Sequence, residues 1–366
     1  MRVLSPKAEL ADKLSAAGRA TSGKSTIQVL SHILLRAEDG ASELAATDME
    51  LSLRVPLEAT VEESGAVVLP RLAADIVRSM PEGQVTIEHR ANEGVVTLTG
   101  GASSFRLNCL QASDFPELPA DEGSGITVPS DRLVRTIERV VRAASRDETR
   151  PVLTGALVRI GPDGIVMVAT DSYRLAVKET PLEAPPSEQR EAIVPARALA
   201  EVARLVGQAK PEDVEVVLTE AQALFRLGGM RLTSRVIDGQ FPDYRQLVPD
   251  GFEHEVVFDR GELLSVLGRI GVLAQRTAPV RLAFSDGQVT ISAISEQLGE
   301  GRESLPVAFS GDPLEMGFNH EFLRNGAESV EGDEVRLGLI SPLRPGLLRG
   351  EGDDYRYLLM PIRLNA

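Results

Sequence analysis

The chain has 366 residues, long enough for two or three domains that each bury a core of their own. Its 43% hydrophobic and 25% charged residues are typical of a soluble globular protein, and the single Cys109 excludes an internal disulfide and any multi-cysteine zinc site. A net charge of −15 predicts that the molecule as a whole repels nucleic acid, and with no signal peptide or long apolar run we expect a cytoplasmic protein without a membrane segment.

The elements predicted along the chain follow one order three times: strand, helix, several strands, helix, strands. Amphipathic segments predict two helices in each third, beginning near Pro6, Pro70, Ser130, Pro195, Asp259 and Asn319. β-Branched stretches such as 164–171 predict strands joined by hairpin turns. Acidic joints containing proline and glycine, at 118–125 and 248–255, predict domain boundaries. We therefore expect an α+β protein with domains over residues 1–120, 125–249 and 254–366.

Sequence motifs recur at a domain-sized interval. The Thr-Asp pair of AATDMELSLRV begins at Thr47 and that of VATDSYRLAV at Thr170, 123 residues later. Phe-Pro pairs begin at residues 115 and 241, and aligned prolines stand at 70 and 195. A fainter third copy places Leu263 where the second has Leu133, and Asn319 where the second has Pro195. The pattern indicates three similar domains in tandem.

One predicted helix carries a basic stripe, which we define as Arg132, Arg135, Arg139, Arg142 and Arg146. Their alternating spacing of three and four residues puts them within an arc of about 80°, opposite an apolar face. Other predicted helices carry arginine pairs seven residues apart: Arg71 and Arg78, Arg197 and Arg204, Arg269 and Arg276. Such segregation in an acidic chain favours an anionic partner over a merely solvated face, with contacts to phosphates that do not depend on base sequence.

Residues 18–25 match the phosphate-loop pattern G-x-x-x-x-G-K-S letter for letter. That loop needs a strand before its glycines, whereas the preceding segment SPKAELADKLSAAG is helix-like. We expect Lys24 to be a basic residue in the loop after the first helix, and a P-loop nucleotide-binding protein stays open as an alternative.

Signals for catalysis are sparse. The four histidines have no metal-ligand spacing, and there is no G-x-S-x-G nucleophile motif. Cys109 lies in an apolar, strand-like setting typical of an inert buried thiol. Asp48 and Asp171, which each follow a predicted strand, are expected to cap turns. We expect no enzyme, no metal and no cofactor.

The three-copy plan, ATDSYRLA at 169–176, DGQFPDYRQLVP at 238–249, GFN at 317–319 and MPIRL at 360–364 together resemble the bacterial sliding clamps, the beta subunits of DNA polymerase III. The resemblance implies a head-to-tail homodimer forming a closed six-domain ring, with helices inside, antiparallel sheets outside and duplex DNA in the channel. It implies a processivity factor that tethers the DNA polymerase III catalytic subunit, and it implies the clamp loader and other clamp-binding polymerases and repair proteins as partners. A divergent clamp-like scaffold that binds an acidic protein is a second alternative.

Three sets of contact residues are expected, the basic set from the charge pattern and the other two from the resemblance. The basic residues expected at DNA are Lys24, Arg71, Arg78, Arg132, Arg135, Arg139, Arg142, Arg146, Arg197 and Arg204. The residues expected at the dimer interface are Phe105, Leu107, Val272 and Leu273. The pocket expected to bind partner peptides comprises Leu153, Thr170, Ser172, Tyr173, Arg174, Leu175, Pro242, Gln246, Leu247, Thr277, Asn319, Phe322, Leu343, Met360, Pro361, Ile362, Arg363 and Leu364.

Overall fold

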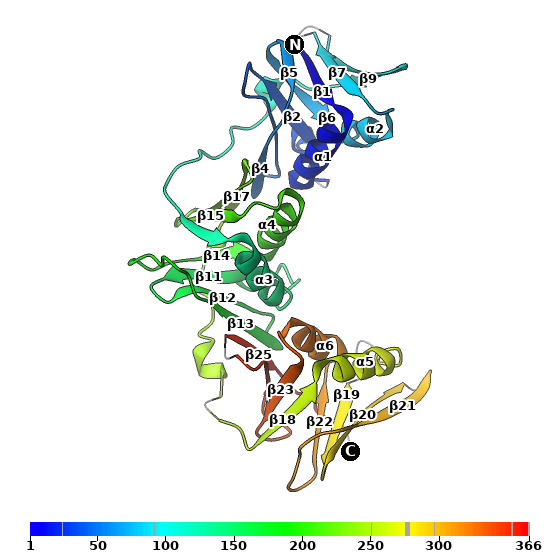
Figure 1. Ribbon diagram of the computed structural model, residues 1–366, viewed down its shortest axis with the longest axis vertical. Coiled ribbons are helices and arrows are strands. Elements are labelled where there is room, and N and C mark those ends of the chain that lie inside the picture. Colours follow the sequence, from blue (N-terminus) through cyan, green and yellow to red (C-terminus); the bar gives the residue numbers. More distant parts are fainter. Residues whose placement is uncertain are drawn as a thin grey trace. The chain divides into compact units, whose positions relative to one another are not determined.

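The computed structural model describes residues 1–23, 25–90, 93–249, 251–274, 279–295, 297–352 and 354–364 (Figure 1). Lys24, Arg276 and Thr277, named above, therefore lie outside the described residues. Contacts divide the chain into two compact units: unit 1 comprises residues 1–131 and 201–236, and unit 2 comprises residues 132–200 and 237–366. The central third of the chain contributes to both units.

Each third of the chain contains the predicted order of elements. The first third comprises β1 (Arg2–Pro6), α1 (Lys7–Ala17), β2 (His32–Ala37), β3 (Glu43–Thr47), β4 (Leu51–Pro56), β5 (Thr60–Glu63), β6 (Gly65–Pro70), α2 (Ala73–Ser79), β7 (Gln84–His89), β8 (Val95–Gly100) and β9 (Ser103–Asn108). The second comprises β10 (Ile126–Pro129), α3 (Ser130–Val141), β11 (Gly155–Gly161), β12 (Gly164–Thr170), β13 (Arg174–Thr180), β14 (Arg190–Pro195), α4 (Ala196–Ala209), β15 (Asp213–Leu218), β16 (Gln222–Leu227) and β17 (Met230–Arg235). The third comprises β18 (His254–Asp259), α5 (Arg260–Ile270), β19 (Val280–Ser285), β20 (Gln288–Ser295), β21 (Gly299–Pro306), β22 (Leu314–Phe318), α6 (His320–Ser329), β23 (Glu334–Leu339), β24 (Gly346–Arg349) and β25 (Tyr355–Leu359).

The six predicted helix starts are confirmed, and local chemistry explains them. Two helices begin with a side-chain cap: Asp259 accepts a hydrogen bond from the Glu262 N–H at 2.8 Å, and Asn319 accepts one from the Phe322 N–H at 3.0 Å. Others follow a proline, whose fixed φ suits the entry to a helix. Each helix then buries one apolar side, as Leu10 and Leu14 do in α1.

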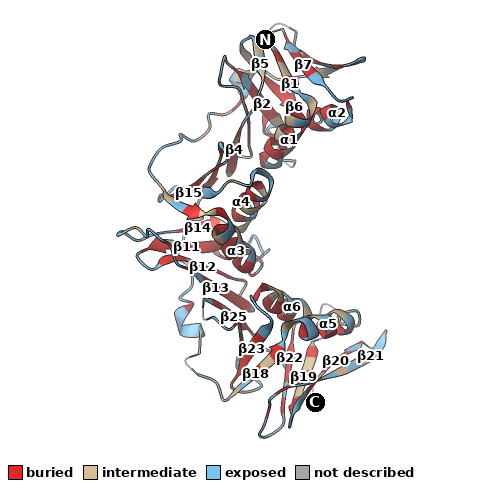
Figure 2. Cartoon of the chain, in the orientation of Figure 1, coloured by how far each residue is buried: buried red, intermediate tan, exposed pale blue. Residues whose placement is uncertain are grey.

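Unit 1 contains two antiparallel sheets. One has five strands in the order β5-β1-β7-β8-β9, and the other has eight in the order β10-β15-β16-β17-β4-β3-β2-β6. Helices α1 and α2 lie side by side on these sheets (Figure 1). The strands turn alternate residues inward, so that Val3, Val85 and Ile87 are fully buried between sheet and helices (Figure 2).

Unit 2 repeats this plan. Its eight-stranded antiparallel sheet has the order β14-β11-β12-β13-β25-β24-β23-β18, and its four-stranded sheet has the order β21-β20-β19-β22. Helices α5 and α6 pack on each other. In contrast to the buried central strands, β21 contains only exposed and half-buried residues (Figure 2).

The large sheets join strands from neighbouring thirds at equivalent places. In unit 1, Leu51 of β4 pairs with Ser234 of β17, and in unit 2, Arg174 of β13 pairs with Leu359 of β25. The α+β class is confirmed, but each eight-stranded sheet belongs to two successive copies. A sequence repeat thus does not coincide with a separate sheet and core, and the boundaries 1–120, 125–249 and 254–366 stay a prediction.

Candidate functional site

The candidate peptide pocket begins at the turn between β12 and β13. The Asp171 carboxylate accepts hydrogen bonds from the backbone N–H groups of Tyr173 and Arg174, at 2.9 and 3.0 Å. Ser172, which lies between Asp171 and Tyr173, has a φ of 80°, in the left-handed region. The Thr170 hydroxyl closes the turn by donating to the Arg174 carbonyl oxygen at 2.6 Å. The prediction that Asp171 caps a turn is confirmed.

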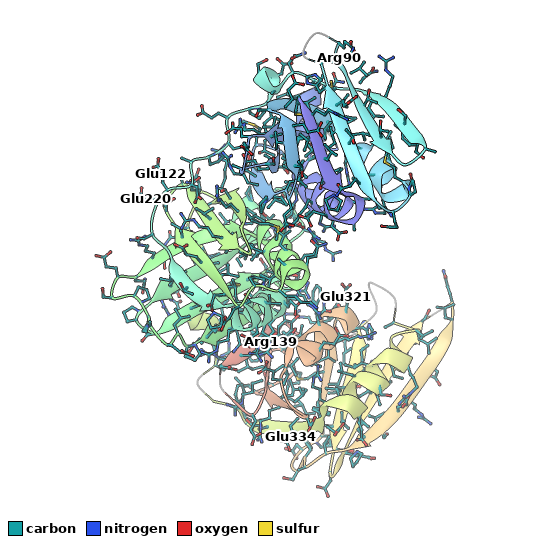
Figure 3. All side chains as sticks on the ribbon, turned by 45° about the horizontal axis from the view of Figure 1, so that its top comes forward. Arg90, Glu122, Arg139, Glu220, Glu321 and Glu334 are labelled. Carbon is teal, nitrogen blue, oxygen red and sulfur yellow. The ribbon has the colours of Figure 1, made fainter. Side chains whose placement is uncertain are left out.

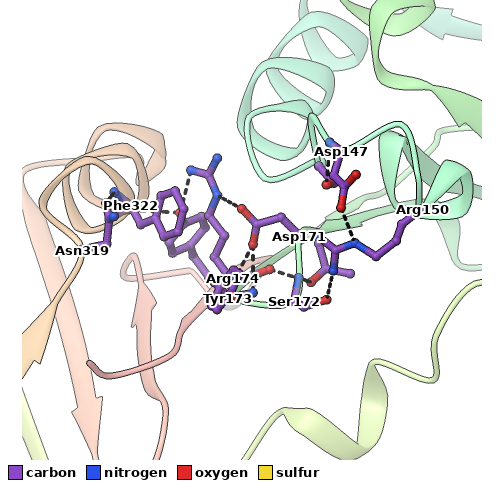
Figure 4. Close-up of polar contacts among 11 residues, drawn as sticks. Asp147, Arg150, Asp171, Ser172, Tyr173, Arg174, Asn319 and Phe322 are labelled. Carbon is purple, nitrogen blue, oxygen red and sulfur yellow. Dashed lines mark hydrogen bonds and ion pairs between the residues drawn. The ribbon is translucent and has the colours of Figure 1, made fainter. Parts of the chain in front are cut away.

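This turn places the buried Arg174 at the centre of the site (Figure 4). Its guanidinium donates to Asp171 at 3.0 Å and to the Tyr357 hydroxyl at 3.3 Å, and it stacks over the Phe322 ring at 4.1 Å from the centroid. Burial opposes the charge, but Tyr357 and Asp171 more than offset it and raise the pKa of Arg174. For Tyr357, by contrast, burial disfavours the ionised form and raises the pKa to about 12. Arg174 is thus a fixed cation that orients an aromatic wall.

The C-terminal segment completes this wall. The Met360 N–H donates to the Tyr173 carbonyl at 2.9 Å, and the Ile362 N–H donates to the Gly317 carbonyl at 2.8 Å. A Cβ on Gly317 would lie 2.7 Å from the Leu364 side chain, so glycine is what lets the tail approach this closely. The structure therefore brings Tyr173, Arg174, Asn319, Phe322 and 360–364 together, as the resemblance implied.

The remaining predicted pocket residues of unit 2 divide into buried and exposed ones. Leu175 belongs to a buried cluster with Leu358 and Tyr244, the latter from the loop at 241–249. In that loop Pro242 and Gln246 are exposed, and Leu247 is 50% exposed. The Gln246 side-chain amide donates a hydrogen bond to the Asp243 carboxylate at 2.7 Å. Leu153 is buried. Leu343 is 63% exposed, and among the described residues no polar contact ties it to the turn.

Sequence reasoning missed two residues that support the turn. Arg150 donates to the Ser172 hydroxyl at 3.1 Å and pairs with Asp147 at 3.0 Å (Figure 4). Tyr357 donates to the Phe322 carbonyl at 3.1 Å and so links β25 to α6. Only the i,i+3 spacing of Asp147 and Arg150 was visible in the sequence, and that spacing alone does not indicate a site.

The first copy contains the same turn with a different lining. Asp48 accepts from the Leu51 N–H at 2.8 Å, and Met49 has φ of 77°, as Ser172 does in the second copy. The turn borders a pocket of about 250 Å³ whose lining includes Ser52, Thr233 and Arg235. By strand register, Leu175 and Leu358 stand where this pocket has Ser52 and Thr233. Two polar positions in the lining of the first pocket are therefore leucines in the second copy.

The basic stripe differs from the prediction in extent and exposure. Helix α3 ends at Val141, because the next turns tighten to bonds such as Ala143 N–H to the Val140 carbonyl, so Arg142 and Arg146 lie beyond the helix. Arg139 is 9% exposed rather than solvated. It is ion-paired with Glu331 and lies 6.0 Å from the centroid of the Tyr355 ring, close to β25 (Figure 3).

Carboxylates distant in the sequence accompany several other basic residues. Arg132 pairs with Glu183 at 3.4 Å, and Arg142 with Glu328 at 2.9 Å. Two further arginines form ion pairs within their own helices: Arg78 with Asp75 and Arg204 with Glu201. The exposed predicted residues are Arg71, Arg78, Arg135, Arg142, Arg146 and Arg197. Sequence reasoning missed Arg19, which binds Glu201 at 2.9 Å.

The phosphate-loop alternative is wrong on structural grounds. Helix α1, not a strand, leads into Gly18, and the described residues after Ser25 form a short 3-10 turn at 28–31 instead of an α-helix. The motif therefore lacks both elements that would direct backbone N–H groups at a phosphate.

The predicted interface residues lie at two outer positions of the fold. Phe105 and Leu107 are on β9, the outer strand of the five-stranded sheet, and Phe105 is 37% exposed. Val272, 77% exposed, and Leu273 follow α5. β21, the outer strand of the four-stranded sheet, passes next to Leu273, whose side chain would lie 2.8 Å from a Cβ on Gly301.

The described part of the chain lacks two other kinds of site or segment. It contains no group of three or more His, Cys, Asp or Glu side chains arranged to hold a metal ion. None of its helices is long and apolar enough to cross a membrane. Cys109 is buried, and burial raises the pKa of its thiol.

Three family models match consecutive parts of the chain. They describe the DNA polymerase III beta subunit: its N-terminal domain over residues 1–119, its central domain over 127–243 and its C-terminal domain over 245–363. The three tandem domains inferred from the internal repeat are thus confirmed as domains of this kind.

Individual relatives agree over the whole length. The beta sliding clamp of Synechococcus elongatus is 33% identical and that of Streptomyces coelicolor 32% identical, each alignment covering 100% of both chains. Among solved structures, the DNA polymerase sliding clamp of Bacillus subtilis has a TM-score of 0.94 at 28% identity, again over 100% of both chains. The DNA polymerase III subunit beta of Pseudomonas aeruginosa has a TM-score of 0.90 at 30% identity over the same coverage.

Proposed function

The chain belongs to the family of DNA polymerase III beta subunits, the bacterial sliding clamps, and from this premise we propose that two copies close head to tail into a six-domain ring around duplex DNA. The ring tethers the DNA polymerase III catalytic subunit and other replication and repair proteins to the template. Its role is topological rather than catalytic. Residues 1–120, 125–249 and 254–366 are its three clamp domains.

The observation that carries this proposal is the tandem of three clamp domains that fills the whole chain. A ring of six such domains needs two copies whose ends match each other. β9 and β21 are outer strands with backbone groups available along one side, a surface suited to pairing with another chain. Phe105, Leu107, Val272 and Leu273 supply apolar surface beside these strands.

Exposed arginines supply the contact with DNA. Arg71, Arg135, Arg146 and Arg197 are exposed on or beside α2, α3 and α4. Their contacts with phosphates are weak, salt-sensitive and independent of base sequence, which permits sliding. Because a closed ring cannot leave the duplex sideways, encirclement supplies the persistence that these contacts lack.

Partner proteins insert a short peptide at the Arg174 site. Exposed Tyr173, Leu247, Leu343 and Met360 provide apolar surface, and Arg174 and Asn319 hold the walls of the site in place. A polymerase held there has a high effective concentration at the primer end without a tighter active site.

Light scattering and DNA retention test the ring directly. We expect a dimer mass in solution and, after loading by the cognate clamp loader, retention on nicked circular DNA with loss from the same DNA once it is linearised. A monomer that leaves both substrates at equal rates would refute the ring.

Four arginine-to-alanine substitutions, each of which removes one positive charge, test the DNA surface. Arg135→Ala, Arg146→Ala and Arg197→Ala should each weaken DNA binding and lower the slope of log K against log salt by about 1. Arg90→Ala is the control, because Arg90 is an exposed arginine on the β7–β8 side of unit 1 (Figure 3). Equal effects of all four variants would show that only net charge matters and would refute the assignment of this surface.

A further inference from the structure

A second pocket lies on the same sheet of unit 2 as the candidate peptide pocket. Its volume is about 320 Å³, and it lies between strands β13 and β25 and the loop at 241–249. Its lining includes Val177, Glu179 and Arg356 from the strands and Tyr244 and Arg245 from the loop. None of these residues belongs to the predicted peptide pocket, so the proposed function leaves this second pocket without an occupant.

The second pocket continues the peptide pocket along the strands. Alternate side chains of a strand lie on one face of the sheet, so Leu175 and Val177 share a face. The strand register places Leu358 opposite Leu175, and Arg356 opposite Val177. Tyr244 belongs to the buried cluster with Leu175 and Leu358 and also lines the second pocket. Two residues of strand span about 7 Å, which is the distance along β13 from the peptide pocket to the second pocket.

The charges of the second pocket leave one arginine without a counter-charge. Arg356 and Glu179 form an ion pair across β25 and β13. Arg245 is exposed, its guanidinium carbon lies 5.5 Å from the centroid of the Tyr244 ring, and no carboxylate in the described part of the chain forms an ion pair with it. The Asp243 carboxylate instead accepts hydrogen bonds from a backbone N–H and a side-chain amide of the loop. Two arginines and one glutamate therefore give the pocket one net positive charge.

The lining of the second pocket matches a glutamate side chain of a ligand. Apolar groups lie beside the arginine, since Val177 is buried and Val248 is half-buried. The methylene groups of a glutamate pack on such groups, while its carboxylate pairs with the guanidinium of Arg245. The net charge of the whole chain is −15, so attraction of an acidic group depends on a local cation of this kind.

We propose that the second pocket binds a carboxylate from the residues that flank the clamp-binding peptide, so that Arg245 favours partners with an acidic flank. This inference rests on the proposed binding of partner peptides at the Arg174 site. An extended peptide advances about 3.3 Å per residue, so a glutamate two to four residues from the side chain seated at Leu175 reaches the second pocket. The planar guanidinium of Arg245 suits a carboxylate, because the two groups pair through two parallel hydrogen bonds.

Fluorescence anisotropy with labelled peptides tests the proposal. The clamp-binding segment of the host polymerase is extended at either end by Gly-Glu-Gly or, for comparison, by Gly-Gln-Gly. At one of the two ends, the glutamate version should bind about two- to fivefold more tightly than the glutamine version at low salt, the size of an exposed ion pair. This glutamate preference should vanish near 1 M salt, where the screening length is about 3 Å.

Two substitutions in the second pocket should change the glutamate preference in opposite directions. Arg245→Ala should abolish it, because the charge without a partner is removed. Glu179→Gln should enlarge it, because that substitution removes the negative charge that faces the incoming carboxylate. Arg90→Ala, which removes an exposed arginine of unit 1, is the matched control and should retain the preference of the unmodified chain.

The outcomes separate this inference from the proposed function. If the peptides bind but the glutamate and glutamine versions have equal affinities at both ends, the inference is wrong and the peptide site stands. A preference that Arg245→Ala preserves would likewise overturn the role of Arg245. If no peptide binds, extended or not, the proposed peptide site at Arg174 is refuted and the inference falls with it.

Discussion

The guanidinium carbon of Arg174 lies 4.1 Å from the centroid of the Phe322 ring, which joins a turn of the second copy to a helix of the third. The two residues are 148 positions apart in the sequence. Asp171 and Tyr357 hold the guanidinium from its other sides, so the stacking does not depend on a mobile side chain. The ring of Phe322 is thereby presented as a fixed wall of the candidate pocket.

Arg174→Ala should weaken binding of a fluorescein-labelled peptide copied from the clamp-binding segment of the host polymerase by about tenfold, because the Phe322 wall loses its support. The peptide affinity of Arg174→Lys should lie between those of the unmodified chain and Arg174→Ala. An ammonium cannot bridge Asp171 and Tyr357 as a planar guanidinium does. Fluorescence anisotropy measures both. Arg54→Ala, which removes an arginine paired with Glu43 in unit 1, is the control and should bind the peptide normally. Normal binding by Arg174→Ala would remove this residue from the site.

Arg139 should contribute to stability more than to DNA binding. Arg139→Ala removes a buried guanidinium from Glu331 and Tyr355, and we expect unfolding in urea to become easier by about 1–3 kcal/mol. Arg132→Ala, which breaks an exposed pair with Glu183, should change stability by less than about 1 kcal/mol. Equal losses in the two variants would mean that burial of Arg139 is without energetic consequence.

Gly326 is where α6 approaches β25. A Cβ there would lie 2.6 Å from both Leu348 Cδ1 and Tyr357 Cδ1. Gly326→Ala should therefore destabilise the protein by about 1–3 kcal/mol through overpacking, measured as a lower urea midpoint. Gly207→Ala, on α4 with no atom within 4 Å of the new Cβ, should instead be neutral or stabilising, because alanine favours a helix. A Gly326→Ala variant as stable as Gly207→Ala would contradict the close approach.

His89 makes stability depend on pH. Burial first, and then the nearby N-terminal ammonium, lower the pKa of His89, and its Nε2 has no hydrogen-bond partner within the described chain. In the unfolded chain a histidine titrates near 6.5. Below that pH the unfolded state binds a proton that the folded state resists, so stability should fall as the pH falls from about 7 to 5. Urea midpoints measured across this range should fall less in His89→Leu, and an equal decline in both proteins would assign the effect elsewhere.

The sequence by itself determined the repeat, the class and the local structure. The helix starts at Asp259 and Asn319 and the turns at Asp48 and Asp171 depend on bonds within three residues, so short-range patterns were enough to predict them. The three-fold order of elements followed from the intervals between equivalent motifs. Membership of the pocket followed from the family resemblance.

Only the tertiary structure decided which charged residues form ion pairs across copies and which strands of different copies pair in one sheet. Helical spacing put Arg139 on a basic stripe expected to face an anionic partner, but Tyr355 and Glu331, about 200 residues away in the sequence, bury it. The pairing of β4 with β17 and of β13 with β25 likewise joins segments far apart in the chain. Periodicity describes one element relative to its own axis, whereas ion pairs such as Arg142–Glu328 depend on which element packs against it, and that information is not local.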